Sequence, residues 1–301
     1  MIIGAIDIGS NTVKLLVGAV KSGRVRPIAR RSAVTRLGGG LDDTGQLPRT
    51  AQDRTIDVLR QFRKVCEKLR ADRIVAAGTE ALRVARNGRA FVKRCRKETG
   101  LPVRILSGAE EARTAFLGAT SGRREPALAA IDIGGGSTEI MVGKPGILRD
   151  ASSLPLGAVR LTELHLKSDP PTLAERLSLL QAVNEGLTAL PKPLRLAASR
   201  SATLLGIGGT CVNVARMAGG ARLPEGLVVS LDTLESILDR LAALPLSRRK
   251  KVRGIDPDRA DIILAGARIM AEAMRLLEIG SFTATVHGLR RGLILQEAAR
   301  R

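Results

Sequence analysis

The five residues Ala-Ile-Asp-Ile-Gly occur twice in the chain, at 5–9 and at 130–134. Each copy is an apolar stretch typical of a buried strand, and it is followed by a turn of small residues and a second apolar run. The elements expected after each copy also agree: three strands, then helix, strand, helix, strand and helix. Two copies of one α/β unit explain this repetition better than chance, and such alternation favours a largely parallel sheet covered by helices.

A polar, turn-rich stretch at 119–125 separates the two copies and predicts a domain boundary. We therefore expect an N-terminal domain over residues 1–121 and a C-terminal domain over residues 122–301. The last predicted helix, 289–300, is a candidate to pack back on the first domain.

Local signals add detail to this plan. A helix interrupted near Asn87 and Gly88 is predicted to end at Gly100, and Ser107 is predicted to cap the helix that follows. In the second copy, the segment 202–209, "ATLLGIGG", is predicted to be a strand followed by a loop.

The charge balance is strongly positive, with 49 Lys and Arg against 29 Asp and Glu, a formal net charge of +20. A genome that favours Arg and a polyanionic partner both explain this excess. The chain has no Trp or Tyr and four Phe, so platforms for stacking nucleic-acid bases are nearly absent. A polyanion without bases, such as polyphosphate, needs no aromatic contact, and no specific nucleic-acid partner is expected.

Neither a signal peptide nor a membrane-spanning segment is expected from the sequence. No apolar run is long enough to cross a membrane, and Asp7 falls where a signal peptide needs an apolar core, so we expect a cytoplasmic protein without a membrane partner. The three scattered cysteines predict thiols rather than disulfides. With two histidines in the chain, acid–base chemistry is expected mainly from carboxylates.

Each copy places an acid at the end of its first strand, Asp7 in the first and Asp132 in the second. Carboxylate oxygens suit Mg²⁺, which binds through one or two acids together with waters and substrate phosphate. The turns that follow can approach an anion through backbone N–H groups and hydroxyls. A single turn of this kind is usually a plain hairpin, but its duplication favours a phosphate site. The turn residues are Ser10, Asn11 and Thr12 in the first copy, and Gly134, Gly135, Gly136, Ser137 and Thr138 in the second.

Further charged residues extend this site. Glu139, at the start of the returning strand, is expected to come back to the crevice of Asp132. Glu110 and Glu111 begin a helix, where they either stabilise its dipole or provide a general base for water. Arg83 is either a ligand of phosphate oxygens or an ordinary exposed helical residue.

The motifs together closely resemble the exopolyphosphatase/guanosine pentaphosphate phosphohydrolase (Ppx/GppA) family, from about residue 2 to about residue 295. The resemblance implies two ribonuclease H-like domains of the actin, sugar kinase and Hsp70 superfamily, which flank a cleft. The matching segments are, in order, "AIDIGSNTVKLLV", "GTEALRVARN", "LSGAEEARTAF", "AIDIGGGSTEIMVG", "SLPLGAVRLTE", "GIGGTCVNVA", "GIDPDRADIILAGA" and "HGLRRGLI".

Residue roles follow from the resemblance. It implies that Glu111 is the catalytic base and that Asp132 and Glu139 bind Mg²⁺ and orient water; the residues themselves add Asp7 as a metal candidate. Positions that match the family's phosphate contacts are Asn11, Thr12, Arg83, Gly135, Gly136, Ser137 and Thr138. Two positions depart from the pattern. Lys14, retained among the substrate-binding candidates, stands where many members have Arg or His, and Glu80 stands where a small residue is commoner. The extra C-terminal helical domains of long members have no counterpart, so a short form is expected.

The function expected from these features is metal-dependent hydrolysis of the terminal phosphate of inorganic polyphosphate. Removal of the 5′ phosphate from guanosine pentaphosphate uses the same chemistry and is the first alternative. A relative that binds a nucleotide or polyphosphate without hydrolysis is the second; a nucleic-acid binder and a sugar kinase have less support. A need for a monovalent cation such as K⁺, binding of guanosine tetraphosphate and a homodimer are left open by the sequence.

Overall fold

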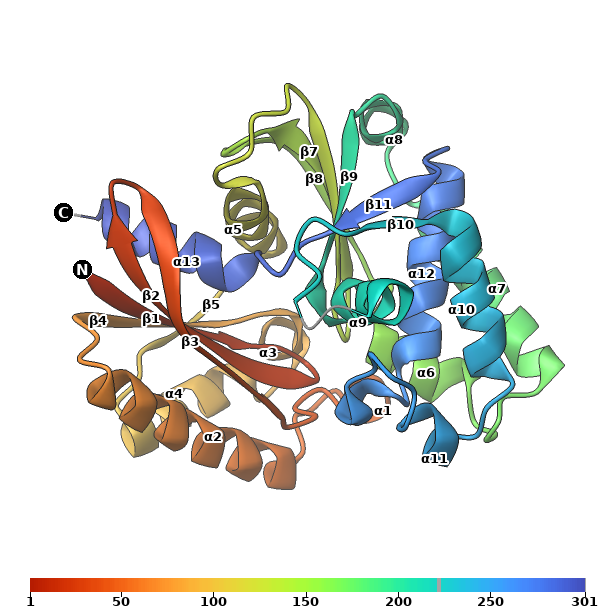
Figure 1. Cartoon of the computed structure of the whole chain (residues 1–301). Helices are drawn as coiled ribbons and strands as arrows, with labels where there is room; N and C mark the ends of the chain where they lie inside the picture. The colour runs from red at the N-terminus through yellow and green to blue at the C-terminus, as the bar shows by residue number, and fades with distance from the viewer. Residues whose placement is uncertain (221–222, 301) are drawn as a thin grey trace. The chain divides into compact units, whose positions relative to one another are not determined.

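The structure is a computed structural model that describes residues 1–220 and 223–300, and it divides into two compact units (Figure 1). Unit 1 comprises Met1–Gly122 together with the residues from His287 onward, and unit 2 comprises Arg123–Val286. The chain thus leaves unit 1 one residue after the position expected from the sequence. The last helix packs on the first domain and belongs to unit 1. Unit 2 therefore ends at Val286, before this helix.

A five-stranded sheet forms the centre of unit 1. Its strands are β1 (Ile2–Ile8), β2 (Thr12–Lys21), β3 (Arg24–Val34), β4 (Arg73–Gly78) and β5 (Val103–Ile105). They lie in the order β3-β2-β1-β4-β5, with β1, β4 and β5 parallel and the β1–β2–β3 meander antiparallel. The helices of this unit are α1 (Leu41–Thr44), α2 (Arg49–Lys68), α3 (Glu80–Val84), α4 (Gly88–Thr99), α5 (Gly108–Thr120) and α13 (Leu289–Ala299).

Helices cover both faces of this sheet, because the strands bury side chains on both. A Cβ built on Gly4 of β1 would meet the side chain of Cys66 on α2, whereas one on Gly18 of β2 would meet Ile294 on α13. Residues of α2 and α4, such as Phe62 and Phe91, pack with Ile6, Ile8 and other apolar strand residues into one core. The sequence alternation of the strands therefore sets which helix each residue faces.

The two helices α5 and α13 cross at very short distance. A Cβ on Gly292 would lie 1.8 Å from the carbonyl oxygen of Thr114, and a Cβ on Gly118 would lie 2.1 Å from that of Gly288. Only glycine fits at either position, because each backbone occupies the space of the other's side chain. The crossing fixes α5, which carries Glu111, to the end of the chain.

Unit 2 is built on a six-stranded sheet. Its strands are β6 (Leu128–Ile133), β7 (Thr138–Lys144), β8 (Ile147–Leu154), β9 (Thr203–Ile207), β10 (Val228–Ser230) and β11 (Ser281–Ala284). The order is β10-β11-β9-β6-β7-β8, with β6, β9 and β11 parallel. The helices are α6 (Ala158–His165), α7 (Leu173–Thr188), α8 (Lys192–Ser199), α9 (Gly208–Gly219), α10 (Leu231–Ala242), α11 (Leu246–Arg249) and α12 (Ile263–Leu276), with a 3₁₀ turn at Pro257–Arg259.

The two sheets confirm the duplication predicted from the repeated pentapeptide. Read from the third strand, both have the order third, second, first, fourth, fifth; unit 2 adds β10 as an antiparallel edge strand. The turn after the first strand repeats as well: Gly9 N–H donates to the Thr12 carbonyl, and Gly134 N–H donates to the Ser137 carbonyl. Gly9 to Lys14 thus correspond position by position to Gly134 to Glu139.

Several local predictions are confirmed, and one is wrong. The chain is interrupted between α3 and α4 near Asn87 and Gly88, α4 ends against a left-handed Gly100, and Ser107 caps α5. The loop expected after the strand at 202–209 is absent, because β9 passes directly into α9 at Gly208. Gly208 has a φ of +87°, a conformation available to glycine, and this allows the abrupt change of direction.

No helix of the described residues is both long enough and apolar enough to cross a bilayer. The three cysteines are free thiols, as predicted, and all three are buried. Burial raises the pKa of Cys66 to about 11 and that of Cys95 to about 12. They are therefore neutral thiols at physiological pH.

Candidate functional site

Two carboxylates face each other in unit 2. Asp132, the next-to-last residue of β6, is paired directly with Glu139, the second residue of β7. Directly opposed residues of an antiparallel pair lie on the same face, with Cβ atoms about 5 Å apart. The structure thus brings together the two acids that the sequence predicted as metal ligands.

The Glu139 side chain is held in place by two hydroxyls. Ser137 Oγ donates to Glu139 Oε1 at 2.8 Å, and Ser153 Oγ on β8 donates to the same oxygen at 2.7 Å. Glu139 is 3% exposed, so these bonds compensate a carboxylate that has lost most of its water. Ser153 was not predicted from the sequence; it is the residue of β8 that the register places opposite Glu139.

The glycine turn of unit 2 directs its carbonyl groups towards α6. Ala158 N–H donates to the Gly134 carbonyl, and the N–H groups of Val159 and Arg160 donate to the Gly135 carbonyl. Among the described residues, the N–H groups of Gly135, Gly136 and Ser137 make no hydrogen bond. These three donors are therefore available to an anion, as the sequence predicted for a phosphate-binding turn.

Two hydroxyls of this turn, predicted as phosphate contacts, have partners within unit 2. Thr138 is completely buried, and its Oγ1 donates to the Leu156 carbonyl at 2.5 Å. Ser137 uses its hydroxyl on Glu139. Their side chains hold the strand and the acid rather than pointing at an anion, because a short turn between antiparallel strands turns alternate residues inward. In this structure the two hydroxyls are thus engaged within unit 2, and the backbone N–H groups of the turn are the donors left for an anion.

The first residue of α9 lies against Asp132. A Cβ on Gly208 would come within 2.7 Å of Asp132 Oδ1, so the absence of a side chain there lets the carboxylate keep its place. The sequence signal was present as two consecutive glycines, but it was interpreted as a loop.

The corresponding turn of unit 1 is supported by the segment after β3. The Asn11 carbonyl accepts from the N–H groups of Thr35 and Arg36, at 3.0 and 2.9 Å, and Gly38 N–H donates to the Ser10 carbonyl. Asn11 is 6% exposed, and its Nδ2 has no hydrogen-bond partner among the described residues. A buried amide donor of this kind calls for a ligand or a water. This position suits the phosphate contact predicted for Asn11, while Thr12 begins β2 and is buried.

The acid of unit 1 has a cation opposite it. Asp7 is paired with Lys14 across β1 and β2, at the position where Asp132 faces Glu139 in unit 2. The duplicated turn therefore offers two carboxylates in unit 2, but one carboxylate and one ammonium in unit 1. Asp7 as a metal ligand has less support than the other two acids, whereas Lys14 suits the predicted anion contact.

Glu80, one of the departures from the family pattern, accepts a hydrogen bond from the hydroxyl of Ser10. Ser10 Oγ donates to Glu80 Oε2 at 3.0 Å. Glu80 is the first residue of α3, at the end of β4 next to the turn. The predicted phosphate donor Ser10 is thus engaged by a carboxylate in this structure.

Arg83 and Glu111 form an ion pair at the same edge of the unit 1 sheet. Arg83 Nη1 on α3 lies 3.0 Å from Glu111 Oε2 on α5 and also donates to the Leu106 carbonyl at 2.9 Å. The carboxyl ends of β4 and β5 lead into these two helices, so the sheet positions both residues. The two are partly buried, which strengthens the attraction of their charges.

The neighbouring Glu110 has a structural task. Its carboxylate accepts from the N–H and hydroxyl of Ser107, and Ser107 Oγ accepts from Glu110 N–H, which completes a capping box. The hydrogen bond from the Ser107 N–H holds the pKa of Glu110 below its ordinary value. The sequence left open which of the two acids serves the helix; in the structure Glu110 does so, and Glu111 faces Arg83.

Comparison with known proteins decides the family. The model of the Ppx/GppA phosphatase family matches residues 16–301. The chain belongs to this family. Exopolyphosphatase 1 of Mycobacterium tuberculosis is 32% identical over 99% of this chain and 88% of its own length. A crystal structure of the Aquifex aeolicus family member has a TM-score of 0.83 at 31% identity, and the match covers 100% of this chain and 98% of that one.

A second branch of the family is also similar to the chain. A guanosine-5′-triphosphate,3′-diphosphate pyrophosphatase of Aeromonas salmonicida is 28% identical over 96% of this chain and 58% of its own length. Family membership identifies the chain as a phosphatase, an enzyme that hydrolyses phosphoric anhydrides, built from two ribonuclease H-like units.

Proposed function

We propose that the chain is an exopolyphosphatase, which releases orthophosphate from the end of inorganic polyphosphate. The observation that carries this proposal is the pairing of Arg83 with Glu111 in unit 1, an anion-binding group beside a carboxylate. Its relative in Mycobacterium tuberculosis is named exopolyphosphatase 1 and matches over nearly the whole chain.

In the proposed reaction, Glu111 accepts a proton from a water whose oxygen attacks the terminal phosphorus, and the bond to the bridging oxygen breaks. Arg83 binds oxygens of the phosphate and compensates their charge. Within unit 1, Asn11 Nδ2 is a further donor for the phosphate. In unit 2, the N–H groups of Gly135, Gly136 and Ser137 are donors that need no reorientation to bind an anion.

Mg²⁺ is the proposed cofactor, and the residues of unit 2 fit it. Asp132 and Glu139 supply oxygen donors on one face, and the two serine hydroxyls orient Glu139. In the described residues no group of three or more His, Cys, Asp and Glu side chains could hold a metal ion, so waters and substrate would complete the coordination. When bound, Mg²⁺ would neutralise charge on the phosphate oxygens.

The alternative substrate, guanosine pentaphosphate, has support from the Aeromonas salmonicida relative. The surface of this chain favours polyphosphate, because all four Phe are buried and Trp and Tyr are absent. A guanine base would therefore find no aromatic side chain to stack on.

The test compares orthophosphate release from polyphosphate and from guanosine pentaphosphate, with wild type, Glu111→Gln and Glu110→Gln. We expect polyphosphate to be the better substrate and Glu111→Gln to lower its kcat by roughly 10²- to 10⁴-fold. Glu110→Gln is the matched control, since it removes the same charge one residue away and should keep most of the activity. Equal activity of the two variants would show that Glu111 is not the base, and a preference for the nucleotide would overturn the substrate.

A further inference from the structure

The positive charge of the chain is concentrated in unit 1. This unit holds 28 Lys and Arg against 12 Asp and Glu, a formal net charge of +16, whereas unit 2 holds 21 against 17, a net charge of +4. A general preference of the genome for Arg would raise both units alike. The asymmetry therefore points to a task of unit 1 itself.

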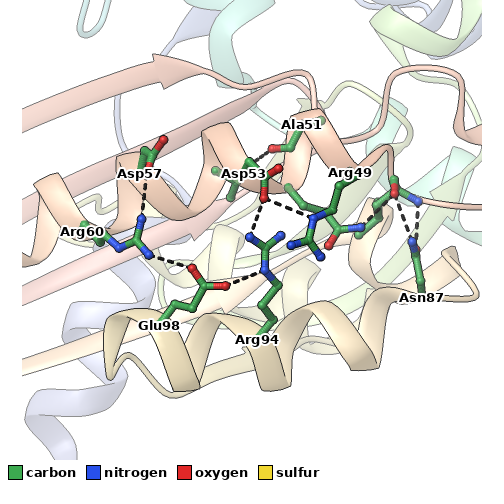
Figure 2. A network of polar contacts seen from close by, with 11 residues as sticks. Arg49, Ala51, Asp53, Asp57, Arg60, Asn87, Arg94 and Glu98 are labelled. Atoms are coloured by element: carbon green, nitrogen blue, oxygen red, sulfur yellow. Dashed lines mark hydrogen bonds and ion pairs between the residues drawn. The ribbon is translucent and has the colours of Figure 1, made fainter.

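Ion pairs within and between α2 and α4 occupy every acid of these two helices. Arg94 binds Asp53 and Glu98, and Arg60 bridges Glu98 and Asp57, as Figure 2 shows. The fourth acid, Glu67, is paired with Arg63 on α2. The seam between the helices is thus balanced in charge, and what is left on their outer surface is basic.

The face of α4 turned away from α2 carries four exposed cations, which we call the basic ridge: Arg89, Lys93, Arg96 and Lys97. Arg89, Lys93 and Lys97 recur every four residues and Arg96 adjoins Lys97, so all four lie on one side of the helix. The paired Arg94 and Glu98 lie on another side. Among the residues that the structure describes, none of the four has an ion-pair partner. Like charges three or four residues apart repel each other and destabilise a helix.

The helix dipole explains only part of this arrangement. Arg96 and Lys97 lie in the last turn of α4, where cations are favourable. Arg89 lies in the first turn, where the dipole opposes a cation, and Lys93 lies between the two ends. The charges of Arg89 and Lys93 therefore do not stabilise the helix, as is expected of residues that serve binding.

The basic ridge begins near the proposed site and leads away from it. Because β4 and β5 are parallel, α4 returns the chain from the carboxyl end of β4 to the amino end of β5. Arg89 therefore lies at the end of α4 next to α3, which carries Arg83, and Lys97 lies at the far end. From Arg89 to Lys97 the helix rises about 12 Å.

We infer that the basic ridge is an accessory binding surface for the distal part of a polyphosphate chain, an inference that rests on the proposed function. A chain whose terminal phosphate is bound by Arg83 can extend along α4 and meet one cation after another. The partner is a polyanion without bases, because no aromatic side chain is exposed in the described chain to stack on a nucleobase. The ridge would raise affinity for long chains and leave short ones unaffected.

The experiment uses the full-length protein in EDTA, so that binding is measured without turnover. A variant with Arg89→Gln, Lys93→Gln, Arg96→Gln and Lys97→Gln is compared with one that loses four exposed charges of unit 2, by Lys144→Gln, Arg149→Gln, Lys192→Gln and Arg200→Gln. The dissociation constants of long-chain polyphosphate, tripolyphosphate and single-stranded DNA of matched charge are measured at several salt concentrations. Thermal unfolding confirms that both variants are folded.

We expect the ridge variant to bind long-chain polyphosphate about tenfold or more weakly. The slope of log affinity against log salt concentration should fall in magnitude by about two to four, because fewer phosphate contacts release fewer counterions on binding. Tripolyphosphate binding and the unit 2 variant should change by less than about twofold. If both variants lower the affinity for long-chain polyphosphate equally, binding depends on net charge rather than on the basic ridge, and the inference is overturned. A loss of tripolyphosphate binding would also overturn it, as would wild-type binding of DNA as tight as that of polyphosphate.

The proposed function can fail separately. Wild-type protein that binds long-chain polyphosphate through the ridge but releases no orthophosphate in Mg²⁺ would contradict the exopolyphosphatase and leave the ridge standing. If the ridge variant hydrolyses long and short chains as fast as wild type, and binds them equally well, the exopolyphosphatase stands and the ridge is contradicted.

Discussion

Arg83 Nη1 lies 3.0 Å from Glu111 Oε2, so the proposed phosphate ligand and the proposed base hold each other. A guanidinium that turns to a phosphate gives up part of its contact with the carboxylate. Binding of the anion and release of the base are therefore linked through one side chain. This relationship makes the two residues energetically dependent, and their effects on activity should not add.

Substitution of both residues tests this dependence. We expect Arg83→Met to raise the KM for polyphosphate and lower kcat by about 10²-fold, because it removes a charge-assisted contact to phosphate. In the Glu111→Gln background the same substitution should still raise KM but change kcat little. Steady-state kinetics of the four proteins give both constants, and fully additive losses in kcat would show that the residues act independently.

Loss of the Ser153 hydroxyl should weaken the metal site. Ser153→Ala removes one of two donors to Glu139 Oε1, and such supporting contacts typically contribute 10- to 100-fold to metal affinity. We expect a shift of that order in the Mg²⁺ concentration needed for half-maximal activity. Ser152→Ala is the control, because Ser152 is paired with Ile140 on the opposite face; an equal shift there would refute the role of Ser153.

A methyl group at position 208 should displace Asp132. Gly208→Ala puts a Cβ at 2.7 Å from Asp132 Oδ1 and also strains a backbone with φ of +87°. Gly146→Ala, at φ of +77° with no atom within 4 Å of the new Cβ, has the strain alone. Both should lower the free energy of unfolding by about 1–2 kcal/mol. Only Gly208→Ala should lower activity, and comparable activity losses in both would mean that Asp132 is not disturbed.

The crossing of α5 and α13 should tolerate no side chain. Gly292→Ala places a Cβ at 1.8 Å from the Thr114 carbonyl oxygen, and forcing the helices apart should cost about 1–3 kcal/mol or more. Gly280→Ala meets no atom within 4 Å and should be close to neutral. Urea unfolding followed by far-UV circular dichroism measures both, since the chain has no Trp or Tyr.

Stability should depend on pH through Glu175. The N–H of Thr172, with those of Ser168 and Lys167, lowers the pKa of this carboxyl from 4.5 to about 2. A depressed pKa means that the stabilisation is fully present above pH 4.5 and is lost as the pH falls towards 2. The difference in Tm between wild type and Glu175→Gln should therefore be constant near neutral pH and shrink below 4.5. A difference that stays constant down to pH 3 would contradict this.

The sequence predicted the two units, because strand alternation and the repeated turns are local patterns. It also predicted the opposition of Asp132 and Glu139, which requires only a short hairpin. Ser153 could not be found in this way, since the register of β8 includes a bulge at Val142 and Gly143. Helix α9 was missed because consecutive glycines usually indicate a loop, whereas in the structure Gly208 leaves room for Asp132 and Gly209 leaves room for the side chain of Arg259.

The helix α13 has a consequence for how the protein is made. Synthesis runs from the N-terminus, so the whole of unit 2 is synthesised between the first 122 residues of unit 1 and α13, which completes that unit. The sheet face that α13 covers therefore stays open while unit 2 is being made. The half that is begun first thus waits longest for its last element, and during that time its apolar face is exposed to aggregation or to a chaperone.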